Sequence, residues 1–243
     1  MSGHSKWHNI QGRKGKQDAL RSNMFTKAAK VIAVAASKGG SDPLMNFSLR
    51  LAIEKAKAAG MPKDNIERAV KKGSGESGSG NTMEELMYEG YGPAGTALII
   101  KTVTDNKNRT VQELKHILSD NGGSLGNSGS VLWMFNQYGW AQISAEQLGA
   151  VSRDEFEMTM IEAGAEDIQD GEDGTIDIKS KVENLKKVLD KLKELNVEPK
   201  DSGLIWEAKD KITASPELQT KLENLFGEFE DNDDIEDWYT NAE

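Results

Sequence analysis

The sequence predicts an α+β protein with more than one domain. Between residues 16 and 72, apolar side chains recur every three or four positions, which is typical of amphipathic helices. Beyond residue 82 the pattern changes to alternation and to short β-branched runs, which is typical of strands. A Gly/Ser-rich stretch from Gly73 to Asn81 separates the two parts and indicates a flexible linker. With 243 residues, the chain is long enough for such a division.

Before the linker, the sequence predicts a small helical domain with an Ala-rich core. Its helices are expected at 16–37, 43–59 and 62–73. Gly39 and Gly40 would end the first helix. Asp42 followed by Pro43 is typical of an N-cap and a first helical position, so the second helix is expected to begin there, with Met45 on its apolar face.

After the linker, the expected strands and helices alternate. Strands are expected at 86–89, 96–104, 131–135, 140–144 and 203–208, and helices at 110–121, 152–163 and 182–195, with a hairpin through 171–174. From residue 140 the order is β-α-β-β-α-β, the ferredoxin-like pattern. A last helix at 218–229 and a strand at 235–239 would follow. The acidic run from Glu228 to Asp234 is expected to be a solvated turn.

Charge is distributed unevenly along the chain. Residues 1–72 carry 15 Lys and Arg against 5 Asp and Glu, whereas the remaining residues carry 15 against 35. Clustered cations beside an aromatic ring suit a polyanion, because phosphates attract the charges and the ring can stack on a base. The candidate nucleic-acid-binding residues of this basic region are Lys6, Trp7, His8, Arg13, Lys14, Lys16, Arg21, Lys27 and Lys30.

A second polar surface is expected where a strand meets a helix, at Asp105–Thr110. Asn106, Lys107 and Arg109 are its candidate binding residues, although a turn with Thr110 as the helix cap would also explain this segment. The Gly/Asn/Ser loop at 121–129 could contact a ligand or serve as a connector. The strand around Trp133 is expected to belong to the core.

Several other functions are not favoured by the sequence. The chain has no cysteine, which excludes disulfides and thiol catalysis. Gly90 to Gly95 matches the dinucleotide motif G-x-G-x-x-G, but a strand rather than a helix follows, so a glycine turn between strands is expected. His4 and His8 do not make a zinc site with one further histidine. We expect no catalysis, no cofactor, no metal, no membrane span and a cytoplasmic location.

Long motifs resemble one known family. They are GHSKW, RKGKQDA with FTK, LAIEKAKAAGMPKDNIERAVKKG, YEGYGP, TDNKNRT, NGG, WMF and, at the end, WYTNAE. By these motifs the chain is similar to the YebC/PmpR family. The resemblance implies a basic helical domain at 1–75, a linker at 76–81, an α/β domain at 82–135 plus 213–243, and a ferredoxin-like α/β domain at 136–212 inserted into it.

The resemblance also implies a non-enzymatic, nucleic-acid-binding regulator of gene expression. Some members are described as DNA-binding transcriptional regulators. Others, including a mitochondrial relative that activates translation of a cytochrome oxidase subunit, act on the ribosome and relieve stalled elongation. Leu20 and Asn23 stand where many relatives carry lysine, which thins the basic face of the first helix. A hydrolase with carboxylates assembled by the fold, and an adaptor that binds proteins through its acidic surface, remain alternatives.

Overall fold

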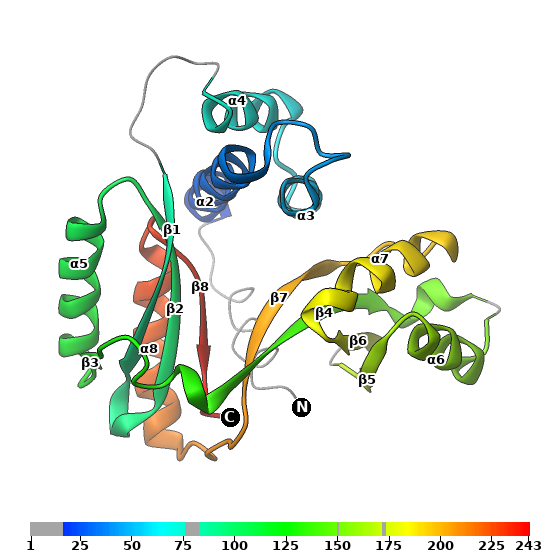
Figure 1. The fold of residues 1–243 in the computed structure, drawn as a ribbon. Coiled ribbons are helices and arrows are strands. Elements are labelled where there is room, and N and C mark those ends of the chain that lie inside the picture. Colours follow the sequence, from blue (N-terminus) through cyan, green and yellow to red (C-terminus); the bar gives the residue numbers. More distant parts are fainter. Residues whose placement is uncertain (1–16, 76–82, 150, 172–173) are drawn as a thin grey trace. The chain divides into compact units, whose positions relative to one another are not determined.

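The computed structural model describes residues 17–75, 83–149, 151–171 and 174–243, and the backbone alone for 17–22 (Figure 1). It confirms the α+β class. Among the described residues, the helical part consists of α2 (Gln17–Gly39), α3 (Phe47–Ala58) and α4 (Lys63–Gly73). Helix α2 packs against both α3 and α4. Their shared core is small and rich in alanine, and it includes Ile32, Ala36, Leu49, Ala56 and Ile66.

The predicted start of the second helix is wrong. Helix α3 begins at Phe47, because Asn46 makes more hydrogen bonds as a cap than Asp42 could. The Asn46 side-chain oxygen accepts from the Leu49 N–H (3.1 Å), and its amide donates to the backbone oxygens of Ala35 and Gly40 (2.8 Å each). Asp42 forms a turn instead, in which its side chain accepts from the Leu44 N–H. Leu44 and Met45 are consequently exposed, so the apolar position expected for Met45 is also wrong.

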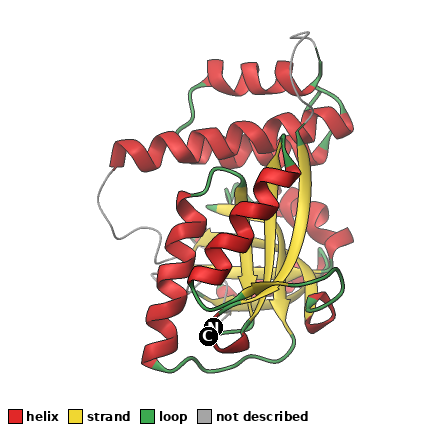
Figure 2. Ribbon diagram, turned by 90° about the vertical axis from the view of Figure 1, so that its left-hand side faces the viewer, coloured by secondary structure: helices red, strands yellow, loops and turns green. Residues whose placement is uncertain are grey.

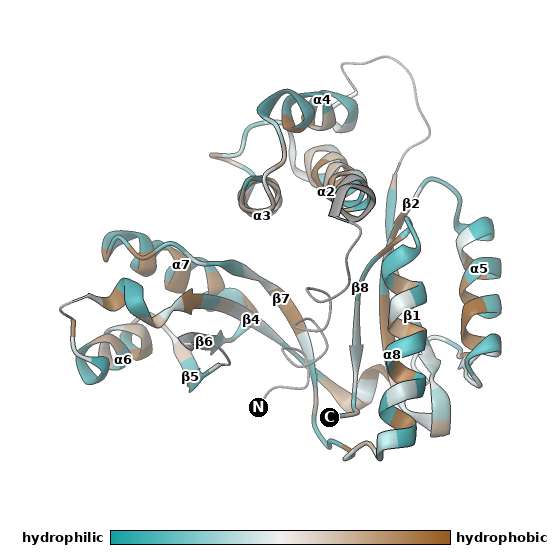
Figure 3. Ribbon diagram, turned by 180° about the vertical axis from the view of Figure 1, so that it is seen from behind, coloured by the Kyte–Doolittle hydropathy of each residue, from teal (hydrophilic) through white to brown (hydrophobic). Residues whose placement is uncertain are grey.

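The first sheet has the antiparallel strand order β3-β1-β2-β8. Its strands are β1 (Glu84–Tyr91), β2 (Ala97–Thr104), β3 (Ser124–Leu125) and β8 (Ile235–Thr240). Helices α5 (Lys107–Asp120) and α8 (Pro216–Asp231) cover one face, and Figure 2 shows them in front of the strands. Hydrophobic and hydrophilic stretches alternate along both helices, as expected where one side is buried (Figure 3).

The Gly90–Gly95 segment is a turn between strands, as predicted. It joins β1 to β2, which pair antiparallel, through a short 3-10 helix at Pro93–Gly95. Ala94 and Gly95 have positive φ values of 56° and 75°. The chain therefore reverses direction here and does not enter a helix that could receive a pyrophosphate.

The second sheet has the strand order β5-β6-β4-β7. Its strands are β4 (Phe135–Ser144), β5 (Ala165–Asp170), β6 (Thr175–Ser180) and β7 (Asp201–Ala208), and its helices are α6 (Arg153–Glu162) and α7 (Leu185–Glu194). This order confirms the ferredoxin-like prediction. Residues 136–207 form one compact unit, while 2–135 and 208–243 form another. The predicted linker at 76–81 lies outside the described residues, and the proposed domain limits stay a prediction.

The strand predicted at 131–135 is wrong. Residues Leu132–Met134 form a short 3-10 helix, and β4 begins at Phe135. The backbone N–H groups of Val131 and Leu132 donate to the carboxylate of Glu89, each at 2.7 Å. Since a side chain satisfies these donors, the segment does not need to pair with a strand.

Candidate nucleic-acid interface

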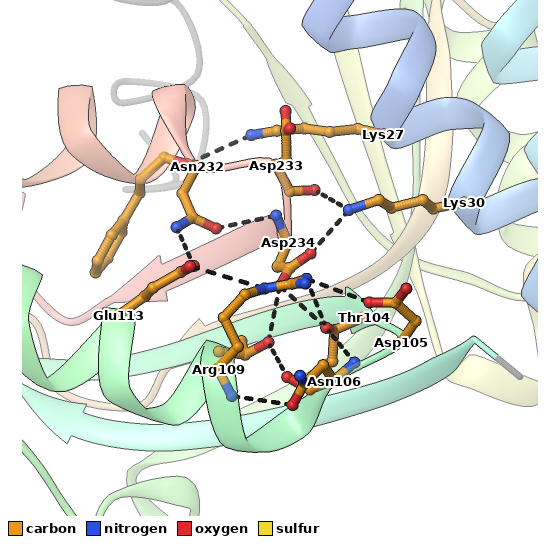
Figure 4. A network of polar contacts seen from close by, with 12 residues as sticks. Lys27, Lys30, Thr104, Asp105, Asn106, Arg109, Glu113, Asn232, Asp233 and Asp234 are labelled. Atoms are coloured by element: carbon orange, nitrogen blue, oxygen red, sulfur yellow. Dashed lines mark hydrogen bonds and ion pairs between the residues drawn. The ribbon is translucent and has the colours of Figure 1, made fainter. Parts of the chain in front are cut away.

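Two of the predicted binding residues, Lys27 and Lys30, lie one turn apart on α2 and face the C-terminal end of α8 (Figure 4). The Lys27 ammonium donates to the backbone oxygens of Phe229 (3.3 Å) and Glu230 (2.7 Å). The Lys30 ammonium donates to the backbone oxygen of Asp233 (2.9 Å). The C-terminal end of a helix carries partial negative charge, so it is a favourable place for a cation. Both lysines are therefore committed to contacts within the protein.

Burial changes the chemistry of the first of these lysines. Loss of water around the ammonium lowers the pKa of Lys27 to about 8, and the nearby negative charge of Glu230 only partly opposes this shift. A lysine that is partly neutral near physiological pH is a weaker phosphate ligand than an exposed one. Within α2, Lys27 is thus better suited to holding α8 than to binding a polyanion.

Asp234 is the centre of the network in Figure 4. One carboxylate oxygen accepts from Lys30 (2.8 Å), and the other accepts from the hydroxyls of Thr104 (3.0 Å) and Thr110 (2.8 Å) and from the Arg109 guanidinium (2.7 Å). Only 3% of the Asp234 side chain is exposed. Burial disfavours the charged carboxylate, but the hydrogen bonds from Lys30, Arg109 and Thr110 outweigh it and lower the pKa of Asp234 to about 2.

The prediction of a solvated acidic turn at 228–234 is therefore wrong. Its first residues complete helix α8, and Asn232 donates from its amide to Glu113 of α5 (3.0 Å). Asp234 is buried and joins α2, β2 and α5 through its two oxygens. Asp234 is therefore a buried acid with several partners, although most acids of the run 228–234 are exposed.

Lys38 extends the contact of α2 with the first sheet. Its ammonium lies 2.7 Å from Glu85 of β1, and Glu85 also accepts from Lys101 of β2 at 2.9 Å. Lys101 in turn lies 3.1 Å from Glu236 of β8. Burial would raise the pKa of Glu85, but the two lysines outweigh it and lower that pKa. This chain of alternating charges links the C-terminal end of α2 to three neighbouring strands.

The Asp105–Thr110 turn contains the second predicted binding surface. Asn106 is the N-cap of α5, since its side-chain oxygen accepts from the Arg109 N–H (3.2 Å); the expectation that Thr110 would cap this helix is wrong. The Arg109 guanidinium bonds to Asp234 and Asp105. Asn106 and Arg109 thus hold the turn together, while the Lys107 side chain is exposed and forms no hydrogen bond or ion pair with the described residues.

Other cations of the helical part are open to solvent. Lys57 of α3 and Lys71 and Lys72 of α4 are exposed and unpaired among the residues that the structure describes. Lys6, Trp7, His8, Arg13, Lys14 and Lys16 lie outside the described residues, and Arg21 lies in α2 without a described side chain. Of the predicted residues, Lys27, Lys30 and Arg109 are therefore paired within the protein. Lys107 is unpaired among the described residues, and the side chains of the N-terminal candidates up to Arg21 are not described. The lysines of α3 and α4 were not among the predicted binding residues, although the excess of Lys and Arg over Asp and Glu in 1–72 indicates them.

A second ordered feature is the loop that precedes β4. Glu89 of β1 is buried, and its carboxylate accepts three backbone N–H groups, from Gly129 (2.6 Å), Val131 (2.7 Å) and Leu132 (2.7 Å). Burial would raise the pKa of Glu89, but these three bonds outweigh it and lower that pKa. The loop is thus bonded to a buried carboxylate of β1, which makes it more than a loose connector, and ligand contact by this loop stays a prediction.

Trp133 stands on this loop, and the prediction that it belongs to the core is wrong. Its side chain is 68% exposed. Its indole N–H donates to the backbone oxygen of Ser130 (3.1 Å), which also accepts from the Tyr91 hydroxyl (3.3 Å). The Lys209 ammonium donates to the backbone oxygen of Trp133 (2.7 Å). An apolar run beside a tryptophan predicts burial in most proteins, and nothing in the run Val-Leu-Trp-Met-Phe reveals the buried acid that redirects it.

Metal binding and membrane insertion find no support in the part of the chain that is described. There, no three His, Asp or Glu side chains come together in a way that could hold an ion. Nor does any described helix have the length and apolar character needed to cross a membrane. What the described residues do present is a helical part with free lysines, joined to an acidic α/β part by one largely buried ion pair, Lys30–Asp234, by the more exposed pair Lys38–Glu85 and by the backbone contacts of Lys27.

The fold and these contacts define a class of multidomain α+β proteins in which basic helices precede a sheet domain with a ferredoxin-like insertion. Family models confirm and narrow this class: one for the "TACO1/YebC protein N-terminal domain" matches residues 5–76, and one for the "TACO1/YebC second and third domain" matches 83–242. The chain belongs to the TACO1/YebC family.

Individual relatives match along the whole chain. "Probable transcriptional regulatory protein TTE1135" of Caldanaerobacter subterraneus subsp. tengcongensis is 44% identical and covers 100% of this chain and 98% of its own length. A "Probable transcriptional regulatory protein" of Maridesulfovibrio salexigens is 46% identical, with 100% and 96% covered. The crystal structure of the "Conserved Hypothetical Protein Aq1575" from Aquifex aeolicus is similar with a TM-score of 0.84 at 39% identity, covering 95% of this chain and 93% of that one.

Proposed function

We propose that this chain is a non-enzymatic, DNA-binding regulator of transcription that acts in the cytoplasm without a cofactor. The observation that carries the proposal is the separation of charge along the chain. Residues 1–72 carry 15 Lys and Arg against 5 Asp and Glu, whereas the remaining residues carry 15 against 35. A basic module approaches a polyanion readily, whereas the acidic remainder is repelled by it. Relatives that match over their full length are named as transcriptional regulatory proteins, which supports the same class.

The internal pairing of α2 refines which residues would bind. Lys27, Lys30 and Lys38 form contacts with the acidic part and are less available to phosphates. Binding is therefore assigned to the cations before them and to the exposed lysines of α3 and α4. The assigned residues of the N-terminal stretch are Lys6, Trp7, His8, Arg13, Lys14, Lys16 and Arg21. Lys107 is assigned as a further contact, because it is exposed and unpaired among the described residues.

The second candidate function is a ribosome-associated translation factor that binds RNA. Trp7 beside Lys6 and His8 favours it, since an aromatic ring among cations suits unpaired bases. The two functions predict different partners for the same basic residues. Sedimentation of cell lysate through sucrose, with the protein followed by antibody, separates them. Travel with ribosomal subunits at physiological salt would favour the RNA function, and absence from those fractions together with duplex DNA binding would favour transcription.

A charge-reversal experiment tests the assignment of the basic module. Arg13, Lys14 and Lys16 are changed together to Glu, and binding to a labelled 30-bp duplex and to an RNA hairpin is measured. We expect binding to both to be lost, because each reversal replaces an attraction to phosphate by a repulsion. The matched control reverses three exposed lysines of α7, Lys186, Lys187 and Lys193, which changes the net charge equally.

The outcome of the control decides between local and overall charge. If the α7 variant also loses binding, net charge alone governs attachment and no interface lies at 13–16. If the first variant still binds as the unaltered protein does, the basic N-terminal module is not the site. Circular dichroism of both variants checks that the helices persist.

A further inference from the structure

The loop at 126–134 is hydrogen-bonded to a buried acid of the first sheet. Glu89 lies in β1 with only 6% of its surface exposed. Moving a carboxylate out of water is unfavourable, and here the compensation comes from three N–H groups of a surface loop, at 129, 131 and 132. The backbone of Gly126 also donates to the Glu89 backbone oxygen (2.8 Å). The main result of burying this acid is a rigid surface loop.

The loop carries an exposed aromatic side chain, that of Trp133. Trp133 is 68% exposed and takes no part in the hydrophobic cluster beneath the first sheet. Its only polar edge is already used, because the indole N–H donates to the Ser130 backbone oxygen (3.1 Å). The Tyr91 hydroxyl donates to the same oxygen (3.3 Å), so a second exposed aromatic residue is bonded to this loop. The indole ring of Trp133 therefore presents a flat, apolar face to solvent.

The surroundings of the ring are polar and contain a cation. Lys209 is exposed, and its ammonium donates to the Trp133 backbone oxygen (2.7 Å), which leaves two further N–H groups of the ammonium to bond elsewhere. The adjacent loop residues, Asn127 and Ser128, are exposed and carry hydrogen-bonding groups. A protein partner would be expected to find a ring of apolar contacts around its tryptophan anchor, and residues 126–130 offer Gly, Asn, Ser, Gly and Ser instead.

We propose that Trp133 is a stacking platform for one unpaired nucleobase, with Lys209 beside it for the adjoining phosphate. An exposed indole accepts any base on its face, and a nearby cation binds the negative backbone that accompanies the base. The proposal relies on nucleic-acid binding by this chain, but it places a second contact outside the basic helical part and specifies single-stranded nucleic acid. Glu89 acts as a positioning residue, because it sets the backbone on which Trp133 stands.

The test measures binding of the full chain to three labelled probes: 12-nucleotide oligouridylate, 12-nucleotide oligodeoxythymidylate and a 12-bp DNA duplex. We expect Trp133→Ala to weaken binding of one or both single strands by roughly 5- to 150-fold and to leave duplex binding unchanged. Trp133→Phe should retain part of the affinity. The control is Met158→Ala, which removes a comparably exposed apolar side chain, 65% exposed, from α6.

A spectroscopic readout reports stacking itself. A base that stacks on Trp133 should quench part of the tryptophan fluorescence, and quenching should be smaller in Trp133→Phe, where Trp7 is the remaining tryptophan assigned to nucleic-acid contact. Glu89→Gln should reduce single-strand affinity in the same direction, since an amide accepts fewer N–H groups than a carboxylate. Its measurement is paired with thermal unfolding, and only a folded variant is compared.

Three results would overturn the proposal. They are equal single-strand affinity of Trp133→Ala and the unaltered chain, an equal loss of affinity for the duplex, and quenching in Trp133→Phe that is as large as in the unaltered chain. If the unaltered protein binds single strands through another surface, only the platform fails. If it binds none of the three probes, the proposed function fails as well, and Trp133 would be assigned to a protein partner.

Discussion

At the scale of single residues, Asp234 has the largest expected effect on stability. Its two oxygens receive hydrogen bonds from α2, β2 and α5, so removal leaves Lys30 and Arg109 without their shared partner. We expect Asp234→Ala to lower the free energy of unfolding by about 2–4 kcal/mol, somewhat below a fully buried pair because Arg109 is partly exposed. Urea denaturation of the purified variant measures the change.

The neighbouring acid provides a matched control for this substitution. Asp233 has an exposed side chain, and its replacement by Ala should change the free energy of unfolding by less than about 0.5 kcal/mol. Equal effects at the two positions would show that the acidic run acts by its total charge and that the hydrogen bonds in Figure 4 contribute little.

The same residue should make stability depend on pH. Asp234 has a pKa of about 2 in the folded protein, against about 3.9 for an unfolded aspartate, so the unfolded chain binds the proton first. The stabilisation is complete above about pH 5, declines as pH falls, and is lost below pH 2, with a size of about 2 kcal/mol. The free-energy difference between the unaltered protein and Asp234→Asn should therefore shrink between pH 5 and pH 3. A constant difference over that range would contradict this.

For individual side chains, the sequence predicts only what the neighbouring residues indicate. The lysines of α2 were identified as important, but sequence gives no distance between Lys30 and Asp234, which are 204 positions apart. Likewise, Trp133 was assigned to the core because apolar neighbours usually mean burial. Its exposure depends on Glu89, whose role is set by packing between distant segments and has no signature in the surrounding residues.

At the scale of secondary-structure elements, the start of α3 depends on one buried amide. Asn46 caps the helix through its oxygen and joins α3 to α2 through its nitrogen. Asn46→Ala should lower the free energy of unfolding by about 1–3 kcal/mol, whereas Asn46→Ser should lose less because a capping oxygen remains. Thermal unfolding compares both with Ser48→Ala, an exposed change in the first turn. If Ser48→Ala has an equal effect, the cap is not responsible.

Elements were predictable where periodicity extends over several turns or strand pairs. The long helix α2 and the antiparallel pair β1–β2 agree with the sequence prediction, since each has an uninterrupted pattern. The prediction failed at short segments, at 42–46 and 131–135, where side chains satisfy backbone groups in place of regular pairing. At 131–135 the bond comes from Glu89 of β1, which is distant in sequence, whereas at 42–46 Asp42 bonds within its own turn.

At the scale of the whole molecule, the described contacts separate two kinds of cation. Lysines of α2 hold the basic helices to the first sheet, while Lys57, Lys71 and Lys72 are exposed and unpaired among the described residues. Each phosphate neutralised changes the slope of log affinity against log salt by about −0.9 on duplex DNA and −0.7 on a single strand. Affinity for nucleic acid should therefore report how many cations are engaged.

We expect a slope of about −3 to −5 for the full chain, near the smaller magnitude because Lys27 and Lys30 are paired internally. Filter binding between 50 and 300 mM potassium chloride measures it. Reversal of Arg13, Lys14 and Lys16 should bring the slope close to zero wherever residual binding can be measured. A slope shallower than about −1 for the unaltered protein would contradict binding through the basic module.

The distance in sequence between Lys30 and Asp234 has a consequence for the protein as it is being made. A ribosome adds about 5–20 residues per second, so the 204 positions between the two take about 10–40 s. Throughout that interval α2 exists without the end of α8 or strand β8, and Lys27 and Lys30 have not yet met their acidic partners. In the growing chain, Lys27 and Lys30 are therefore without these partners until the residues near Asp234 have been made.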